Sequence, residues 1–318
     1  MSSAIDYLRE LHNQLHDNKQ WIPPDLLKHR VEQFEEMGSV YASRADTLTI
    51  EGRENFLYNS VVKPLLTNIP PKDAHALVDI PVGLLPIYEP NAWALQTPGG
   101  ENLIAMHTEL AAVISFYSEL QCAVRKIYNE TGKKPLELHR EGLEAVFQSF
   151  LQQREVAFPV IPVKLTFEEL ALVQMLTYGS QLFILAHEFA HVALGHTGDC
   201  VSVRLEMGTK PNVRKVNWEQ QQELDADLRA FEWLCHLKGK DLGVLLRLAA
   251  KSPITSLQFL LLLHLVEAHV GFPDATSTHP PALERLNHIA CGARRLLSDP
   301  ETETLSQWIS TTEQIKSL

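Results

Sequence analysis

Two histidines one helical turn apart are the first residues whose spacing could do chemistry. Residues 187–191 read His-Glu-Phe-Ala-His. Positions i and i+4 project from the same helix face, so His187 and His191 can present ring nitrogens to one cation. Glu188 lies beside that face, where it can take a proton from a metal-bound water. The pattern predicts a metal site with a general base. The alternative is two histidines that are either exposed to solvent or buried with hydrogen-bond partners in the core.

A catalytic zinc site needs a third protein ligand and an open position. His196 lies five residues past His191, on a different face of a continuing helix, which makes it a poor third ligand. Glu223 and Asp227 are four residues apart and share a helical face. Glu223 can bind the metal while Asp227 accepts the distal N–H of a ligand histidine. The alternative is a solvated acidic helix face.

These segments together resemble a known group of enzymes. HEFAH (187–191) followed by ELDAD (223–227) resembles the gluzincin zinc metallopeptidases, with their pattern HExxH…ExxxD. Residues 91–106 resemble the edge-strand segment of the HtpX/CAAX-prenyl-protease type, and residues 278–286 resemble its HPxxxxR segment. Those relatives are membrane proteins and this chain has no convincing span. Soluble peptidases of the Lit type or the ImmA/IrrE type are therefore the nearer functional models.

The resemblance implies a role for each matching residue. His187, His191 and Glu223 would bind one Zn²⁺, Glu188 would be the general base, and Asp227 would orient a ligand histidine without itself binding the metal. His279 and Arg285 would lie near the cleft and stabilise the tetrahedral oxyanion; for His279 the alternative is a turn residue before two prolines. An edge strand would pair with an extended substrate through the residues Leu103, Ile104, Ala105 and Met106. Manganese or nickel could use the same ligands as zinc.

The elements that must position these residues are mostly helices. Thr166-Phe-Glu-Glu169 predicts a capping box at the start of a long apolar helix over 167–195, with a candidate interruption at Tyr178-Gly179. A second helix is expected from residues 217–220 to Gly239, and others over 4–37, 108–129, 138–154 and four C-terminal segments, the first at 241–250. Pro98-Gly99-Gly100 predicts a hairpin-like turn before a strand at Asn102–Met106. The expected fold is α+β and helix-dominated: a zincin-like metallopeptidase core with a small sheet and an N-terminal helical extension.

Composition narrows the class of protein. The chain has 318 residues, 45% of them hydrophobic, with 28 Lys+Arg against 39 Asp+Glu and a net charge of −11. This is ordinary globular composition, and its acidic balance argues against a general nucleic-acid binder. Four scattered cysteines without a CxxC pair, and an N-terminus without a signal-peptide pattern, favour a cytoplasmic protein. The most apolar stretch, 253–266, is too short to span a bilayer.

The expected organisation is a helical extension over 1–78 and a zincin-like domain over 79–318 with an insertion around 131–165. The leading hypothesis is a soluble zinc endopeptidase acting on a protein or peptide substrate. A catalytically silent metal-bound sensor or interaction protein is the alternative. A third hypothesis is a protease that stays silent until an effector or regulatory partner binds through 1–78 or 131–165.

Overall fold

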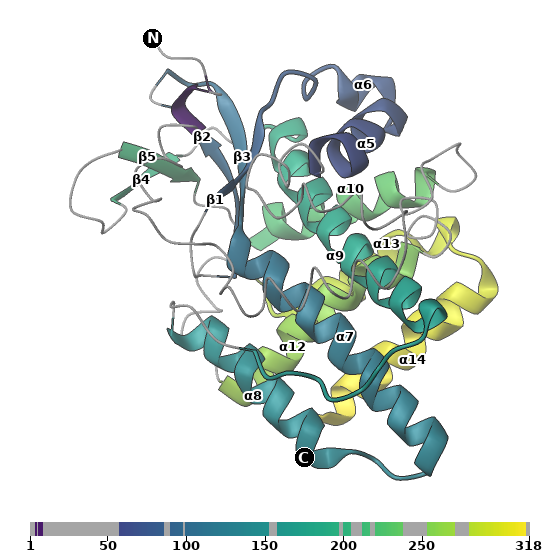
Figure 1. The fold of residues 1–318 in the computed structure, drawn as a ribbon. Coiled ribbons are helices and arrows are strands. Elements are labelled where there is room, and N and C mark those ends of the chain that lie inside the picture. Colours follow the sequence, from purple (N-terminus) through teal and green to yellow (C-terminus); the bar gives the residue numbers. More distant parts are fainter. Residues whose placement is uncertain are drawn as a thin grey trace.

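Helices form most of the described chain, and a small mixed sheet lies at one side of them (Figure 1), which confirms the predicted helix-dominated α+β class. The structure is a computed structural model. It describes residues 4, 6–8, 57–85, 90–97, 99–152, 158–196, 200–204, 212–216, 220–237, 253–270 and 280–315. The predicted helix at 241–250, most of the one at 4–37, and His279 lie outside these residues.

The helices follow the predicted segments closely where both can be compared. Their bounds are α5 (Lys63–Asn68), α6 (Pro71–Ala74), α7 (Thr108–Thr131), α8 (Leu136–Gln152), α9 (Phe167–Ala193), α10 (Gln220–His236), α12 (Gln258–Val270), α13 (Ala282–Gly292) and α14 (Asp299–Ile315). Shorter helical turns span Tyr58–Val62, Pro253–Leu257 and Arg294–Leu296.

The long helix α9 begins at the predicted capping box. The Thr166 side chain accepts a hydrogen bond from the Glu169 backbone N–H, and the Glu169 carboxylate accepts one from the Thr166 N–H at 2.7 Å. The helix is continuous through Gly179, so the expected interruption at Tyr178-Gly179 is wrong. A Cβ atom at Gly179 would lie 3.3 Å from the Cα of Ser256. The glycine therefore allows close packing of the turn at Pro253–Leu257 rather than a break.

The sheet contains five described strands in the order β1-β3-β2-β5-β4. Their bounds are β1 (Val82–Leu85), β2 (Ala92–Gln96), β3 (Asn102–His107), β4 (Cys200–Arg204) and β5 (Asn212–Val216). β1 runs parallel to β3, and the other neighbours are antiparallel. The predicted turn joins β2 to β3, with Gly100 at φ +87°, a conformation that favours glycine.

The structure corrects the expected edge strand. The predicted substrate-pairing residues Leu103, Ile104, Ala105 and Met106 all lie in β3, which pairs with β1 on one side and β2 on the other. Both rows of backbone hydrogen-bonding groups are therefore used within the sheet, and β3 cannot add an extended peptide. The expectation was wrong because β1 comes from a proline-rich segment whose strand the sequence pattern does not reveal.

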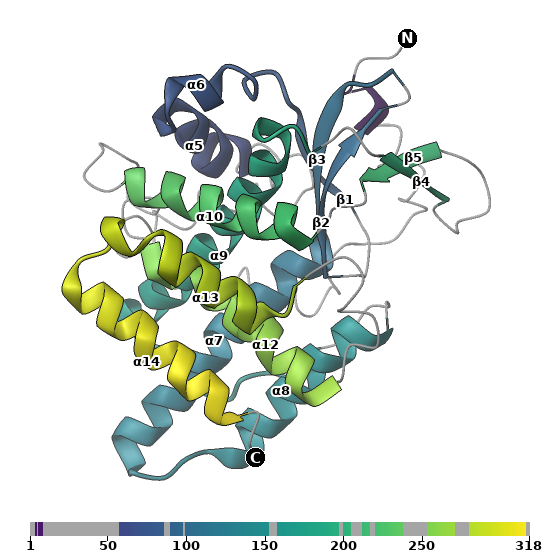
Figure 2. The same ribbon diagram turned by 180° about the vertical axis from the view of Figure 1, so that it is seen from behind.

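Helix α9 lies at the centre of the main hydrophobic core. It packs against α7 and α10 and against the sheet (Figures 1 and 2). The largest core side chains come from α9 and α10 and include Phe183, Phe189, Phe231 and Trp233. Of the described helices, α9 is long and apolar enough to cross a membrane, and 61% of its apolar window is buried inside the protein. That burial is what a core helix requires.

The two faces of β3 enter different hydrophobic clusters, because successive side chains of a strand point to opposite faces. Ile104 and Met106 join the main core, whereas Leu103 and Ala105 join a smaller cluster with Tyr7 from the N-terminal segment. Residues of the segment 57–77 also contribute to the main core. The predicted domain boundary after residue 78 and the insertion at 131–165 stay predictions.

Candidate metal centre

The three predicted ligands come together in the interior. His187 and His191 lie one turn apart on α9, and Glu223 approaches from α10. The Nε2 atoms of the two histidines are 3.0 Å apart, and each lies 3.4 Å from one carboxylate oxygen of Glu223. All three side chains are buried, with Glu223 only 1% exposed. The structure thus gathers two imidazoles and one carboxylate around one point, as a group that could hold a metal ion.

The packing of α9 against α10 produces this arrangement. Phe189 of α9 and Phe231 of α10 belong to the same core cluster. Residues four apart share a helix face, so the two histidines of α9 face the same side. Glu223 lies in the first turn of α10, where the positive end of the helix dipole favours a carboxylate.

Asp227 and Arg285 form a buried pair behind His187. The Asp227 carboxylate lies 2.9 Å from Nδ1 of His187 and accepts two hydrogen bonds from Arg285, at 2.6 and 2.7 Å. Burial alone would raise the pKa of Asp227, but the adjacent guanidinium holds that pKa below its usual range. Asp227 therefore presents an ionised carboxylate to Nδ1 of His187.

Arg285 contacts Asp227 in a way that the sequence analysis did not anticipate. Its Nε and Nη2 atoms each donate a hydrogen bond to the Asp227 carboxylate, and the residue is 7% exposed. Bidentate pairing of this kind fixes the orientation of both partners. These contacts favour a supporting role through Asp227 over the predicted role of stabilising an oxyanion.

A hydrogen atom or a cation must lie between the two rings. Nδ1 of His187 faces Asp227, and Nδ1 of His191 lies 3.0 Å from Nδ1 of His196. The Nε2 atoms of His187 and His191 then face each other at 3.0 Å, which needs a shared proton or a cation. Burial disfavours charge on His187, but Asp227 and Glu223 outweigh it and raise its pKa to about 10.

The donor set also fits a divalent metal ion. Two imidazole nitrogens and a carboxylate are typical ligands of catalytic zinc, at about 2.0–2.2 Å from the ion. Tetrahedral ligands at that distance lie roughly 3.3 Å from one another, close to the spacing of 3.0 to 3.4 Å between these atoms. Burial, followed by the charge on His187, lowers the pKa of His191 to about 3, so its ring is neutral as a ligand must be.

Glu188 is placed and tuned for proton transfer. It is 7% exposed and lies on α9 between the two histidines. Burial raises its pKa to about 7, with a further contribution from the negative charge of Glu223. The charge on His187, a hydrogen bond from the backbone of Ala94 and the charge on Arg285 oppose this rise. A carboxyl group with a pKa near neutrality can both accept and return a proton at that pH.

The strand beside Glu188 is β2, which the sequence analysis did not connect with the site. In the β2–β3 ladder, Thr97 N–H donates to Glu101 O and His107 N–H donates to Asn91 O. Alternation along an antiparallel pair then directs the backbone groups of Ala92 and Ala94 away from β3. The backbone of Ala94 faces Glu188. Alternation along residues 91–97 could have shown that every second residue directs its backbone groups to the same strand edge. It could not have shown what lies beside that edge.

His196 lies next to the candidate metal centre, although the sequence makes it a poor third ligand. It is no third ligand, because its ring lies beside Nδ1 of His191, away from the Nε2 atom that faces Glu223. The sequence signal for this position was Gly195, because a glycine just past a helix end commonly ends the helix and turns the chain back. His279 lies outside the described residues.

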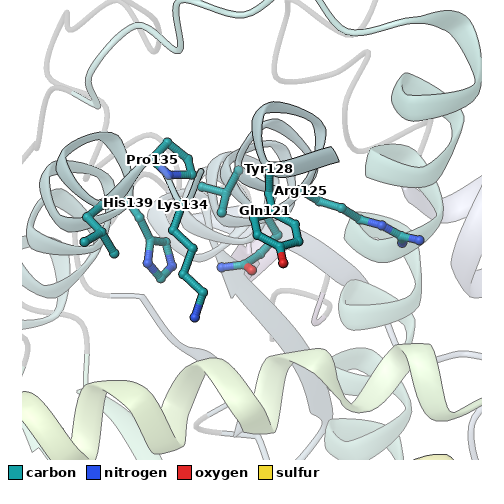
Figure 3. Close-up of a pocket in the computed structure, with 8 residues that line it drawn as sticks. Gln121, Arg125, Tyr128, Lys134, Pro135 and His139 are labelled. Atoms are coloured by element: carbon teal, nitrogen blue, oxygen red, sulfur yellow. The ribbon is translucent and has the colours of Figure 1, made fainter. Parts of the chain in front are cut away.

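A separate pocket of about 380 Å³ lies where α7 ends and α8 begins (Figure 3). Its lining residues are Gln121, Val124, Arg125, Tyr128, Lys134, Pro135, Leu136 and His139. The side chains of Lys134 and His139 point to the same side of the pocket (Figure 3). None of these residues belongs to the His-His-Glu group, so the pocket is distinct from the candidate metal centre.

A comparison with known proteins found one match to a family of peptidases. Residues 140–295, just under half of the chain, match the family model described as Peptidase U49. The match covers His187, Glu188, His191, Glu223 and Asp227, together with Arg285. No curated protein and no solved structure matches the chain. The match to this Lit-type peptidase family, together with the buried His-His-Glu group, supports a metallopeptidase-like protein.

Proposed function

We propose that this chain is a zinc-dependent endopeptidase whose ligands are His187, His191 and Glu223. The observation that carries the proposal is the buried convergence of these three side chains with a fourth, Glu188, whose pKa lies near neutrality. A site that only stabilises structure has no use for such a base and usually closes its fourth position with cysteine or histidine. The Peptidase U49 match supports the same reaction class.

The residues divide the work of peptide hydrolysis. A bound divalent ion would polarise the scissile carbonyl and make a water molecule more acidic. Glu188 takes a proton from the attacking water and returns it to the leaving amine. Asp227 keeps the proton of His187 on Nδ1, so that Nε2 faces Glu223, and Arg285 holds Asp227 in place.

The substrate is proposed to lie along β2. Ala92 and Ala94 direct their backbone groups away from β3, and within the described strands β5 pairs only with Leu95 and Gln96. An extended peptide added beside this stretch would pair with the backbone of Ala92 and the carbonyl of Ala94, because the Ala94 N–H already donates to Glu188. This places substrate pairing one strand away from the position predicted at β3.

The test removes the base and keeps the metal ligands. Glu188→Gln should bind one zinc per chain and lose at least about 100-fold in cleavage rate, the scale of general-base catalysis. His187→Ala should lose the zinc itself. Glu168→Gln, on the first turn of the same helix, is the matched control and should behave like wild type. The assays are elemental analysis and cleavage of denatured casein, with and without chelator.

The outcomes separate the competing functions. Cleavage by Glu188→Gln at the wild-type rate would show that the base is misassigned. A wild-type protein that holds zinc but cleaves neither casein nor itself would favour the sensor or the effector-gated protease. Stoichiometric zinc in His187→Ala would contradict the ligand set.

A further inference from the structure

The outer ring nitrogen of His191 is engaged by a second histidine. Nδ1 of His191 and Nδ1 of His196 are 3.0 Å apart, with the ring centroids 5.2 Å apart and the planes inclined at 62°. We propose that His196 is a positioning residue that fixes the tautomer and orientation of His191. The inference rests on the proposed function, because it assigns His191 as a metal ligand through Nε2.

A left-handed turn brings His196 to this position. On a continuing helix a residue five places on would be rotated by about 140°. Instead α9 ends at Ala193, and Gly195 adopts φ +72°. The Leu194 N–H donates to Ala190 O at 2.9 Å and the Gly195 N–H donates to Val192 O at 3.0 Å, which closes the end of the helix. The chain then reverses and returns the ring of His196 to that of His191.

The contact with His196 can fix which ring nitrogen of His191 carries the proton. A neutral histidine carries one ring proton, so a ring that binds metal through Nε2 carries that proton on Nδ1. Ligand histidines commonly donate this N–H to an outer partner, and loss of the partner typically weakens metal binding by about 10- to 100-fold. Asp227 is that partner for His187. His196, accepting through Nδ1, is the corresponding partner for His191.

The two outer partners differ in charge. Asp227 is an ionised carboxylate balanced by Arg285. His196 is an imidazole, which can accept the N–H of His191 without adding another carboxylate to a buried site that already holds Glu188 and Glu223. Buried like charges repel strongly where the dielectric constant is low. A neutral acceptor therefore orients His191 at a lower electrostatic cost than a further buried carboxylate would.

Substitutions at position 196 separate this role from simple packing. His196→Ala removes the acceptor, whereas His196→Asn keeps an acceptor oxygen at the same distance from the backbone as Nδ1. His139→Ala, on α8, is the histidine control outside the site. For each protein we would measure the zinc dissociation constant by chelator competition and the melting temperature without metal. The tautomer of His191 in the metal-free protein would be measured by ¹⁵N NMR.

We expect His196→Ala to bind zinc about 10- to 100-fold more weakly, with a shifted tautomer signal and an unchanged melting temperature. His196→Asn should recover most of the affinity, and His139→Ala should match wild type. Wild-type affinity and an unchanged His191 tautomer in His196→Ala would overturn the inference. Absence of zinc binding by wild type would instead overturn the proposed function, and the tautomer measurement would still decide the contact with His196.

Discussion

Removing Arg285 should destabilise the protein strongly even before metal is considered. Its guanidinium makes two hydrogen bonds of 2.6 and 2.7 Å to Asp227, which is fully buried. Arg285→Met leaves that carboxylate without its compensating charge, and breaking a buried pair in this way costs about 3–5 kcal/mol. Total stabilities are about 5–15 kcal/mol, so the loss is a large fraction. At roughly 2 °C per kcal/mol for a large domain, the melting temperature should fall by about 6–10 °C.

The double variant Asp227→Asn/Arg285→Met distinguishes this cause from lost packing. With neither charge of this pair left, it should lose only about 1–2 kcal/mol, the scale of its missing hydrogen bonds. It should therefore be more stable than either single variant, a strong coupling in a double-mutant cycle. Urea unfolding of the metal-free proteins measures the cycle, and chelator competition measures zinc. We expect weaker zinc binding in all three variants, because each disturbs the outer partner of His187.

Two results would refute this reasoning. Additive losses in the double variant would show that Asp227 and Arg285 do not act as a pair. A melting temperature of Arg285→Met within about 1 °C of wild type would show that no unpaired buried charge is left behind.

The remaining predictions concern packing and thiol chemistry. Gly179→Ala gains up to about 1 kcal/mol in helix propensity, but its Cβ would lie 3.3 Å from Ser256 Cα. Overpacking against backbone costs about 1–3 kcal/mol, so we expect a net loss of roughly 1 kcal/mol in urea unfolding, and a stabilised variant would contradict the packing. Burial raises the pKa of the Cys122 thiol to about 11, whereas Cys291 is exposed. Because the thiolate is the reactive form, alkylation at pH 8 mapped by mass spectrometry should modify Cys291 first. Cys122 should react only after unfolding or at strongly alkaline pH, and equal labelling rates would count against its burial.

Local sequence patterns were enough to predict most of the helices and the two histidines of the candidate metal centre. The capping box fixes the start of α9 because both of its hydrogen bonds join residues three apart. The spacing of His187 and His191 places them on one face for the same kind of local reason. The spacing of Glu223 and Asp227 likewise puts both on one face of α10, although it cannot show what that face meets.

Contacts between distant segments explain what the sequence reading missed. β3 is an interior strand because β1 pairs with it, and that pairing joins residues such as Val82 and Ile104. Arg285 faces Asp227, 58 positions away. Neither relation has a local signature, because strand partners and buried ion pairs depend on how whole elements pack.

The sequence by itself determined the chemical types at the centre and the helices that carry them, because helical periodicity and capping act over three or four residues. Only the tertiary structure decided which group faces which: Glu223 toward both histidines, Arg285 toward Asp227, His196 toward His191, and β2 beside Glu188. Hydrogen bonds and pKa values in a buried site depend on separations of a few ångströms between side chains from different elements. Those separations are set by the packing of α9 against α10 and the sheet.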